Sequence, residues 1–171
     1  MTPVSNQTEL LNAVASKETH IQAVSDFTVS KQITVRCSLT LTGCSDECPV
    51  SLYKDASFPS AMFHVSEGGS LTLQNIVLDG QKELHSGRDP MNRSLILISG
   101  GTLILKHGTV LRNNHSYTEG GGVYFSASVP SKSISVTKIR RFRAAPPDSA
   151  EELLWPLSNI PMINFQSWDA L

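Results

Sequence analysis

The chain has 171 residues, enough for one domain with a buried core, and a formal net charge of −1. A nearly neutral chain has no field that draws it to nucleic acid or anionic lipid, so we expect no nucleic-acid partner. Its longest apolar runs, such as Leu95–Ile98, are far shorter than the roughly 20 residues of a membrane helix, so we expect no membrane span.

Residues 1–18 predict a short helix that caps the rest of the domain. Ser5 or Thr8 can cap its start, and Glu9 suits the positive end of the helix dipole. The apolar residues at positions 10, 11 and 14 share one face, which should lie on something apolar. The first eight residues have neither a basic start nor an apolar run, so no secretory signal is visible.

Residues 21 to 41 hold the clearest strand signal. Nine of the eleven odd positions are apolar or cysteine, whereas Val24 is the only apolar residue at the even positions from 22 to 42. A period of two over this length requires extended chain with one buried face, and it excludes helix. Polar breaks at Ser25–Asp26 and Ser30–Lys31 divide the stretch into short strands.

A glycine pair followed by alternating leucines occurs twice, 32 positions apart. Gly68–Leu73 reads Gly-Gly-Ser-Leu-Thr-Leu, and Gly100–Leu105 reads Gly-Gly-Thr-Leu-Ile-Leu. Each tract lies in a block of three strand-like segments: 61–65, 71–73 and 76–80 in the first block, and 94–98, 103–105 and 110–111 in the second. Such a repeat is typical of a solenoid, in which one unit buries its apolar face only when the next stacks on it.

The repeat has a loop inside it and fades after it. A further block begins at Gly120 and then loses the pattern, although residues 131–139 can form one more strand. Three strands per unit with glycine and asparagine at the corners predict a triangular coil. Residues 81–93 are polar and contain Gly87 and Pro90, so we expect a loop that leaves one corner.

These segments resemble the amino-terminal part of pectate-lyase-like right-handed parallel β-helix proteins. The resemblance rests on Ile21–Val29, Ile33–Cys44 and Phe63–Gly80 and covers about residues 5–126. Asn113–Asn114 with Gly120–Tyr124 is similar to the polymorphic outer-membrane and adhesin-type members. The resemblance implies an all-β fold, a right-handed single-stranded parallel β-helix of about three to four coils. We expect an N-terminal capping helix region at 1–18, coils at 19–137 and an irregular tail at 138–171.

The superfamily includes polysaccharide-cleaving enzymes as well as non-catalytic surface proteins. The resemblance implies that a lyase would hold calcium with several aspartates and use an arginine as base, and that a polygalacturonase-like member would use aspartates with a Gly-His-Gly element. The candidate residues are Asp79, Arg88, Asp89, His107 and Glu119. An enzyme would bring the acidic residues and the arginine together in a groove.

The candidates themselves favour structural roles. Asp79 lies in an Asp-Gly corner, which favours a turn role. The Lys-His-Gly around His107 departs from the Gly-His-Gly element, so we expect a surface or corner residue there. Adjacent opposite charges at Arg88–Asp89 are usually solvated. We therefore expect no catalytic residue, no metal and no cofactor.

The cysteines predict a turn that is closed by a disulfide. Cys44 and Cys48 flank a polar segment after Gly43, and we expect a disulfide between them, with Cys37 as a small core residue. Related β-helix proteins show a similar turn, in which Gly-x-Cys precedes a cysteine flanked by proline, as at Pro49. The alternative is three free thiols. Zinc is disfavoured because a fourth close ligand is lacking, although His64 could supply one.

Three Asn-x-Ser/Thr sequons, at Asn6, Asn92 and Asn114, are glycosylation sites if the chain is secreted. Downstream, a short basic patch at 138–143 favours a solvated linker over a contact with an anionic polymer. Beyond it, Trp155, Phe165 and Trp168 could shield the open end of the coils. Alternatively, the tail is sequence unrelated to the repeat.

The function that this sequence favours is a non-catalytic surface or secreted β-helix module for adhesion or for glycan or protein binding. The abrupt loss of the repeat also fits a fragment of a longer protein. The alternative is a carbohydrate-active enzyme of the pectate-lyase-like fold, a polysaccharide lyase or glycoside hydrolase, or its N-terminal fragment. A remnant without a function is a third possibility. The expected partners are a polysaccharide or another surface protein, and the resemblance places the chain outside the cell or on its surface. Ligand and oligomeric state stay open.

Overall fold

The computed structural model describes residues 1–45, 48–84, 93–116, 120–126 and 133–136. Within them the chain forms one helix and fourteen strands. The helix is α1 (Gln7–Ala15), and the strands are β1 (Thr2–Val4), β2 (His20–Ala23), β3 (Phe27–Val29), β4 (Ile33–Val35), β5 (Ser38–Thr42), β6 (Val50–Lys54), β7 (Phe63–Ser66), β8 (Ser70–Gln74), β9 (Ile76–Asp79), β10 (Ile96–Ser99), β11 (Thr102–Leu105), β12 (Val110–Arg112), β13 (Val123–Phe125) and β14 (Ser133–Val136).

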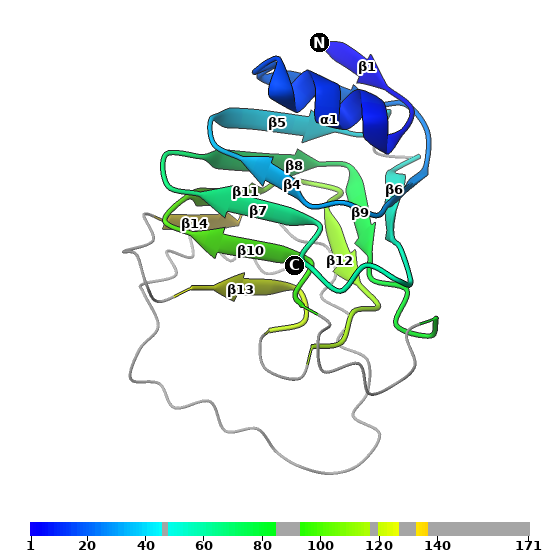
Figure 1. Cartoon of the computed structure of the whole chain (residues 1–171). Coiled ribbons are helices and arrows are strands. Elements are labelled where there is room, and N and C mark those ends of the chain that lie inside the picture. Colours follow the sequence, from blue (N-terminus) through cyan, green and yellow to red (C-terminus); the bar gives the residue numbers. More distant parts are fainter. Residues whose placement is uncertain (46–47, 85–92, 117–119, 127–132, 137–171) are drawn as a thin grey trace, which may run out of the picture.

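The strands form three stacked sheets around one axis (Figure 1). Sheet A has the order β1-β2-β5-β8-β11-β14, sheet B the order β3-β6-β9-β12, and sheet C the order β4-β7-β10-β13. Neighbouring strands within each sheet are parallel. Along the chain each coil takes one strand from A, then B, then C, with the right-handed sense that twisted parallel strands favour. The predicted short right-handed parallel β-helix is therefore confirmed, with four three-strand coils from β2 to β13.

The core is a stack of inward side chains that repeats from coil to coil. Leu39, Leu71 and Leu103 are in register on sheet A, and each is almost completely buried. On sheet C, Phe63 pairs with Ile96 in the same way. Each inward residue contacts the residue one strand spacing away, about 4.8 Å. A single coil could not bury these side chains by itself, which explains why the sequence pattern has to repeat.

The two positions of each glycine pair require glycine for different reasons. Gly68 and Gly100 have φ values of 78° and 86°, a conformation that side chains rarely adopt. The second glycine of each pair touches the preceding coil. A Cβ on Gly69 would lie 2.3 Å from the backbone oxygen of Val35, and a Cβ on Gly101 would lie 2.4 Å from a valine side chain. The pair therefore combines a left-handed corner with close stacking.

The helix α1 covers the N-terminal end of the core, as predicted for residues 1–18 (Figure 1). Leu10, a residue of this helix, is fully buried against the core. The expected cap residues were wrong: Asn6 is the N-cap, because its Oδ1 accepts the Glu9 N–H at 3.0 Å. Ser5 instead donates its N–H and its hydroxyl to the Glu9 carboxylate, at 2.7 and 3.0 Å.

Two strands were not predicted. β1 precedes the helix and pairs with β2 at the outer edge of sheet A. Pro3 is tolerated there because the outermost strand has one side without a partner. β6 completes the second coil, and Val50, Leu52 and Lys54 alternate inward along it. The second coil thus places its extra residues at 43–49 and 55–62, whereas the third places them at 81–93.

Of the predictions for the C-terminal part of the chain, the structure describes the residues of only one, the strand within 131–139. β14 confirms the strand expected within residues 131–139 and pairs with β11. The tail at 138–171, with its basic patch and its two tryptophans, lies outside the described residues. None of the helices in the described ranges has the length and hydropathy needed to cross a membrane.

Candidate functional site

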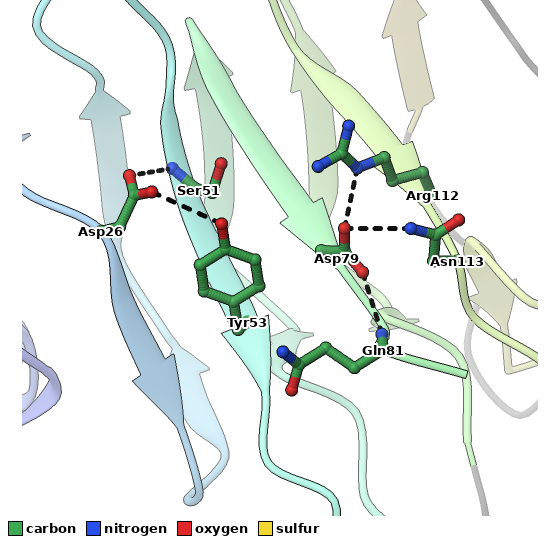
Figure 2. A network of polar contacts seen from close by, with 7 residues as sticks. All are labelled: Asp26, Ser51, Tyr53, Asp79, Gln81, Arg112 and Asn113. Atoms are coloured by element: carbon green, nitrogen blue, oxygen red, sulfur yellow. Dashed lines mark hydrogen bonds and ion pairs between the residues drawn. The ribbon is translucent and has the colours of Figure 1, made fainter. Parts of the chain in front are cut away.

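The outward face of sheet B carries a polar network (Figure 2). Asp26 precedes β3, and its Oδ1 accepts the backbone N–H of Ser51 at 2.8 Å. Its Oδ2 accepts the hydroxyl of Tyr53 at 3.4 Å. The carboxylate of Asp26 therefore accepts the N–H of Ser51 on β6, as a backbone carbonyl would do if β3 began one residue earlier. Asp26 holds the first two coils together and is already engaged on both oxygens.

Asp79 ends β9 and is only 5% exposed. Its Oδ1 accepts the N–H of Gln81 at 2.9 Å, which closes the corner where Gln81 has a φ of 48°. Its Oδ2 accepts bonds from Arg112 Nε at 2.8 Å and Asn113 Nδ2 at 3.1 Å, both from the next coil (Figure 2). The predicted turn role is confirmed. Three donors occupy this carboxylate, so both of its oxygens are engaged in holding the corner and in binding the next coil.

Of the other enzyme candidates, His107 alone lies within the described residues. Arg88, Asp89 and Glu119 lie outside the described residues, so the catalytic groove stays a prediction. His107 lies in the turn between β11 and β12, and its carbonyl accepts the N–H of Asn75 at 3.0 Å, which confirms a corner role. Among the residues with described positions, no three His, Cys, Asp or Glu side chains form a metal-binding group.

The outward face of sheet C contains a histidine–serine pair that the sequence did not reveal. His64 on β7 and Ser99 on β10 lie on neighbouring strands, with Nε2 2.6 Å from the serine Oγ. Partial burial lowers the pKa of His64, and the charge of Arg36 lowers it further. A neutral ring can accept the serine proton. Within the described residues, however, its Nδ1 lacks the orienting partner that nucleophilic pairs use.

The outward face of sheet A is rich in hydroxyl groups. Ser38, Ser70 and Thr102 are in register across β5, β8 and β11. Thr40 and Thr72 form a second row beside them. The alternation places these side chains outward, since the leucines between them are buried.

The cysteines do not form the expected covalent turn in this structure. Cys44 and Cys48 are exposed free thiols, and Cys37 is half-buried rather than in the core. The Cys44 thiol instead lies 3.7 Å from the carbonyl oxygen of Ala23 and 3.8 Å from that of Val24. The alternative of three free thiols is the state observed.

The sequons differ in how free their amide nitrogens are. Asn6 is exposed, and its Nδ2 has a single long contact of 3.3 Å to Ser5. Asn114 donates through Nδ2 to the carbonyl oxygens of Arg93 and Gly121, at 3.0 and 2.6 Å. A glycan on Nδ2 removes one of its two hydrogens, so both bonds could not persist. Asn92 lies outside the described residues.

A buried lysine marks the point where the chain returns to the coils after residues 81–93. Lys54 is fully buried at the end of β6, and its Nζ donates to the carbonyl oxygen of Arg93 at 3.1 Å. The N–H of Arg93 in turn donates to the carbonyl of Pro59 at 2.8 Å. The ammonium of Lys54 is also 6.0 Å from the ring centre of Phe58. The base of the predicted loop is therefore fixed by the second coil.

No protein-family model, no curated protein and no solved structure matches the chain. The three faces of the β-helix therefore have to be interpreted from their own side chains.

Proposed function

We propose that the chain is a non-catalytic binding module of a surface or secreted protein, which presents the outer faces of its stacked sheets to a glycan or protein partner. The pectate-lyase-like superfamily, with its adhesin-type members, is the proposed family. The location outside the cell belongs to the same proposal and follows from that resemblance.

The occupied carboxylate of Asp79 is the observation that carries this proposal. It is the candidate acid that the structure describes, and its oxygens bind two side chains and one backbone N–H. Asp26 is engaged in a similar way by Ser51 and Tyr53. These acids stabilise the coils, and the outward face of sheet A presents serine and threonine side chains in regular rows. Regular rows of neutral groups favour binding rather than proton transfer.

The experiment is to incubate the purified chain with a panel of neutral and acidic polysaccharides and to measure binding and cleavage together. We expect retention of the protein on at least one polymer, without new reducing ends or unsaturated products. Product formation that depends on the protein would favour the alternative, a polysaccharide lyase or glycoside hydrolase. Absence of binding to every glycan would leave a protein partner, which capture on a cell surface of defined composition would test.

A further inference from the structure

The two sequons within the described residues use their asparagine amides in opposite ways. Asn6 precedes α1 in extended backbone, with φ of −154° and ψ of 168°, and is the N-cap of this helix. Its Oδ1 accepts the Glu9 N–H at 3.0 Å, so the cap depends on the amide oxygen. N-glycosylation modifies the amide nitrogen and leaves the oxygen in place. A glycan on Asn6 is therefore compatible with the cap.

The amide nitrogen of Asn6 belongs to an exposed sequon. Asn6 and Thr8, its first and third residues, are both exposed. The Nδ2 of Asn6 lies 3.3 Å from the hydroxyl oxygen of Ser5. Hydrogen bonds from Ser5, and to a smaller extent from Asn6, lower the pKa of the Glu9 carboxyl. A glycan removes one of the two hydrogens on Nδ2, and the remaining hydrogen can still serve a surface contact of this kind.

Asn114 uses its amide nitrogen instead. Its Nδ2 donates to the carbonyl oxygens of Arg93 and Gly121, at 3.0 and 2.6 Å, and so joins the segments that precede β10 and β13. The side chain also packs against the corner at Gly80, where a Cβ would lie 2.4 Å from the Cβ of Asn114. A glycan on this nitrogen would break one of the two bonds in a closely packed corner.

The third residue of each sequon shows the same contrast. A sequon requires a hydroxyl group at this position. The Oγ of Ser116, which belongs to the Asn114 sequon, is buried and has no hydrogen-bond partner in the described part of the chain. Thr8 is exposed in the first turn of α1. An enzyme that recognises the folded protein could therefore reach the Asn6 sequon but not the Asn114 sequon.

From these observations we infer that Asn6 is an N-glycosylation site and that Asn114 is a structural asparagine, which stays unmodified in the folded protein. The inference rests on the proposed location outside the cell and adds a modification site to it. Asn6 lies between β1 and α1, at the N-terminal end of the stacked coils (Figure 1). The glycan is therefore attached at that end, whereas the corner after β12 stays bare.

The test directs the whole chain into the secretory pathway of a eukaryotic cell with an added signal peptide. Peptide-N-glycosidase converts each glycosylated asparagine into aspartate, and mass spectrometry of the peptides then locates the modified positions. Every chain carries Asn92→Gln, because that sequon lies outside the described residues. We expect Asn6 to be modified in most of the secreted molecules and Asn114 in almost none.

Two variants separate the sequons without changing either asparagine. Thr8→Ala should abolish the glycan, and Ser116→Ala, the matched control, should leave it in place. Circular dichroism melting shows whether each secreted chain is folded, and peptide mapping of the chain that carries only Asn92→Gln decides the question even where a sequon variant does not fold.

A folded, secreted chain with a glycan on Asn114, or with none on Asn6, would overturn the inference. Neither result would affect the proposed binding function, which is measured by retention on polysaccharides and on cell surfaces. Conversely, a chain that is glycosylated at Asn6 and binds no partner would support this inference and remove the binding function.

Discussion

Replacing Gly69 by alanine tests how closely the coils stack. A Cβ at this position would lie 2.3 Å from the backbone oxygen of Val35, and real contacts of this kind are essentially never below 3.0 Å. The two coils must therefore separate locally by about 0.7 Å, a form of overpacking that costs about 1–3 kcal/mol and sometimes more. In a domain of this size each kcal/mol lowers the melting temperature by about 2–4 °C.

Two further alanine variants make the experiment specific. Gly68→Ala puts a side chain at a φ of 78°, which costs about 1–2 kcal/mol without a clash. Gly122→Ala is the control, because the nearest atom to its Cβ is 3.7 Å away, an ordinary contact. Thermal melting followed by circular dichroism should rank Gly69→Ala and Gly68→Ala below the wild type and leave Gly122→Ala unchanged. Equal melting temperatures for Gly69→Ala and Gly122→Ala would refute the stacking argument.

The remaining predictions concern polar contacts. Asp79→Asn should lower the free energy of unfolding, measured with urea, by about 1–3 kcal/mol, because it weakens the bonds to Arg112 and Asn113. When Arg112→Gln is added to the same chain, we expect little additional loss, because the two residues share one bond. Lys54→Met keeps the apolar stem and removes the ammonium, with its bond to Arg93 and its contact with Phe58, so we expect a loss of about 2 kcal/mol by the same assay. An unchanged stability would contradict a net stabilising role for this ammonium. The pKa of His64 is lowered from its ordinary value of 6.5 by partial burial, so the folded state favours the neutral ring. The resulting stabilisation is complete above pH 6.5 and is lost as the pH falls through the folded-state pKa. His64→Gln should therefore lose less stability than the wild type on acidification, and NMR titration of the wild type should show the lowered pKa directly.

The coils could be predicted because their signals are local. The alternation from residue 21 to 41 and the paired tracts at Gly68 and Gly100 each reflect one strand and one corner, which neighbouring residues determine. The same logic would have found β6, since Val50, Leu52 and Lys54 alternate inward. A lysine in an inward position hid that pattern, because lysines are almost never fully buried.

The contacts between coils could not be predicted in the same way. The role of Asp79 at its corner followed from Asp-Gly, but its partners Arg112 and Asn113 come from the next coil. His64 and Ser99 are 35 residues apart, and only the register of β7 with β10 places them together. Coils differ in length, so the register cannot be counted from the sequence. The disulfide prediction depended on the spacing of Cys44 and Cys48 around a polar turn and on a similar turn in related proteins, and the free thiols of these two residues do not support it.

The central claim is that this β-helix binds a polymer without cleaving it. The most direct measurement is the molar mass of a polysaccharide, by light scattering, before and after long incubation with enough of the chain to saturate it. We predict that the protein is retained on the polymer and that the molar mass does not change. A steady fall in molar mass that requires the folded protein would contradict this account and establish an enzyme.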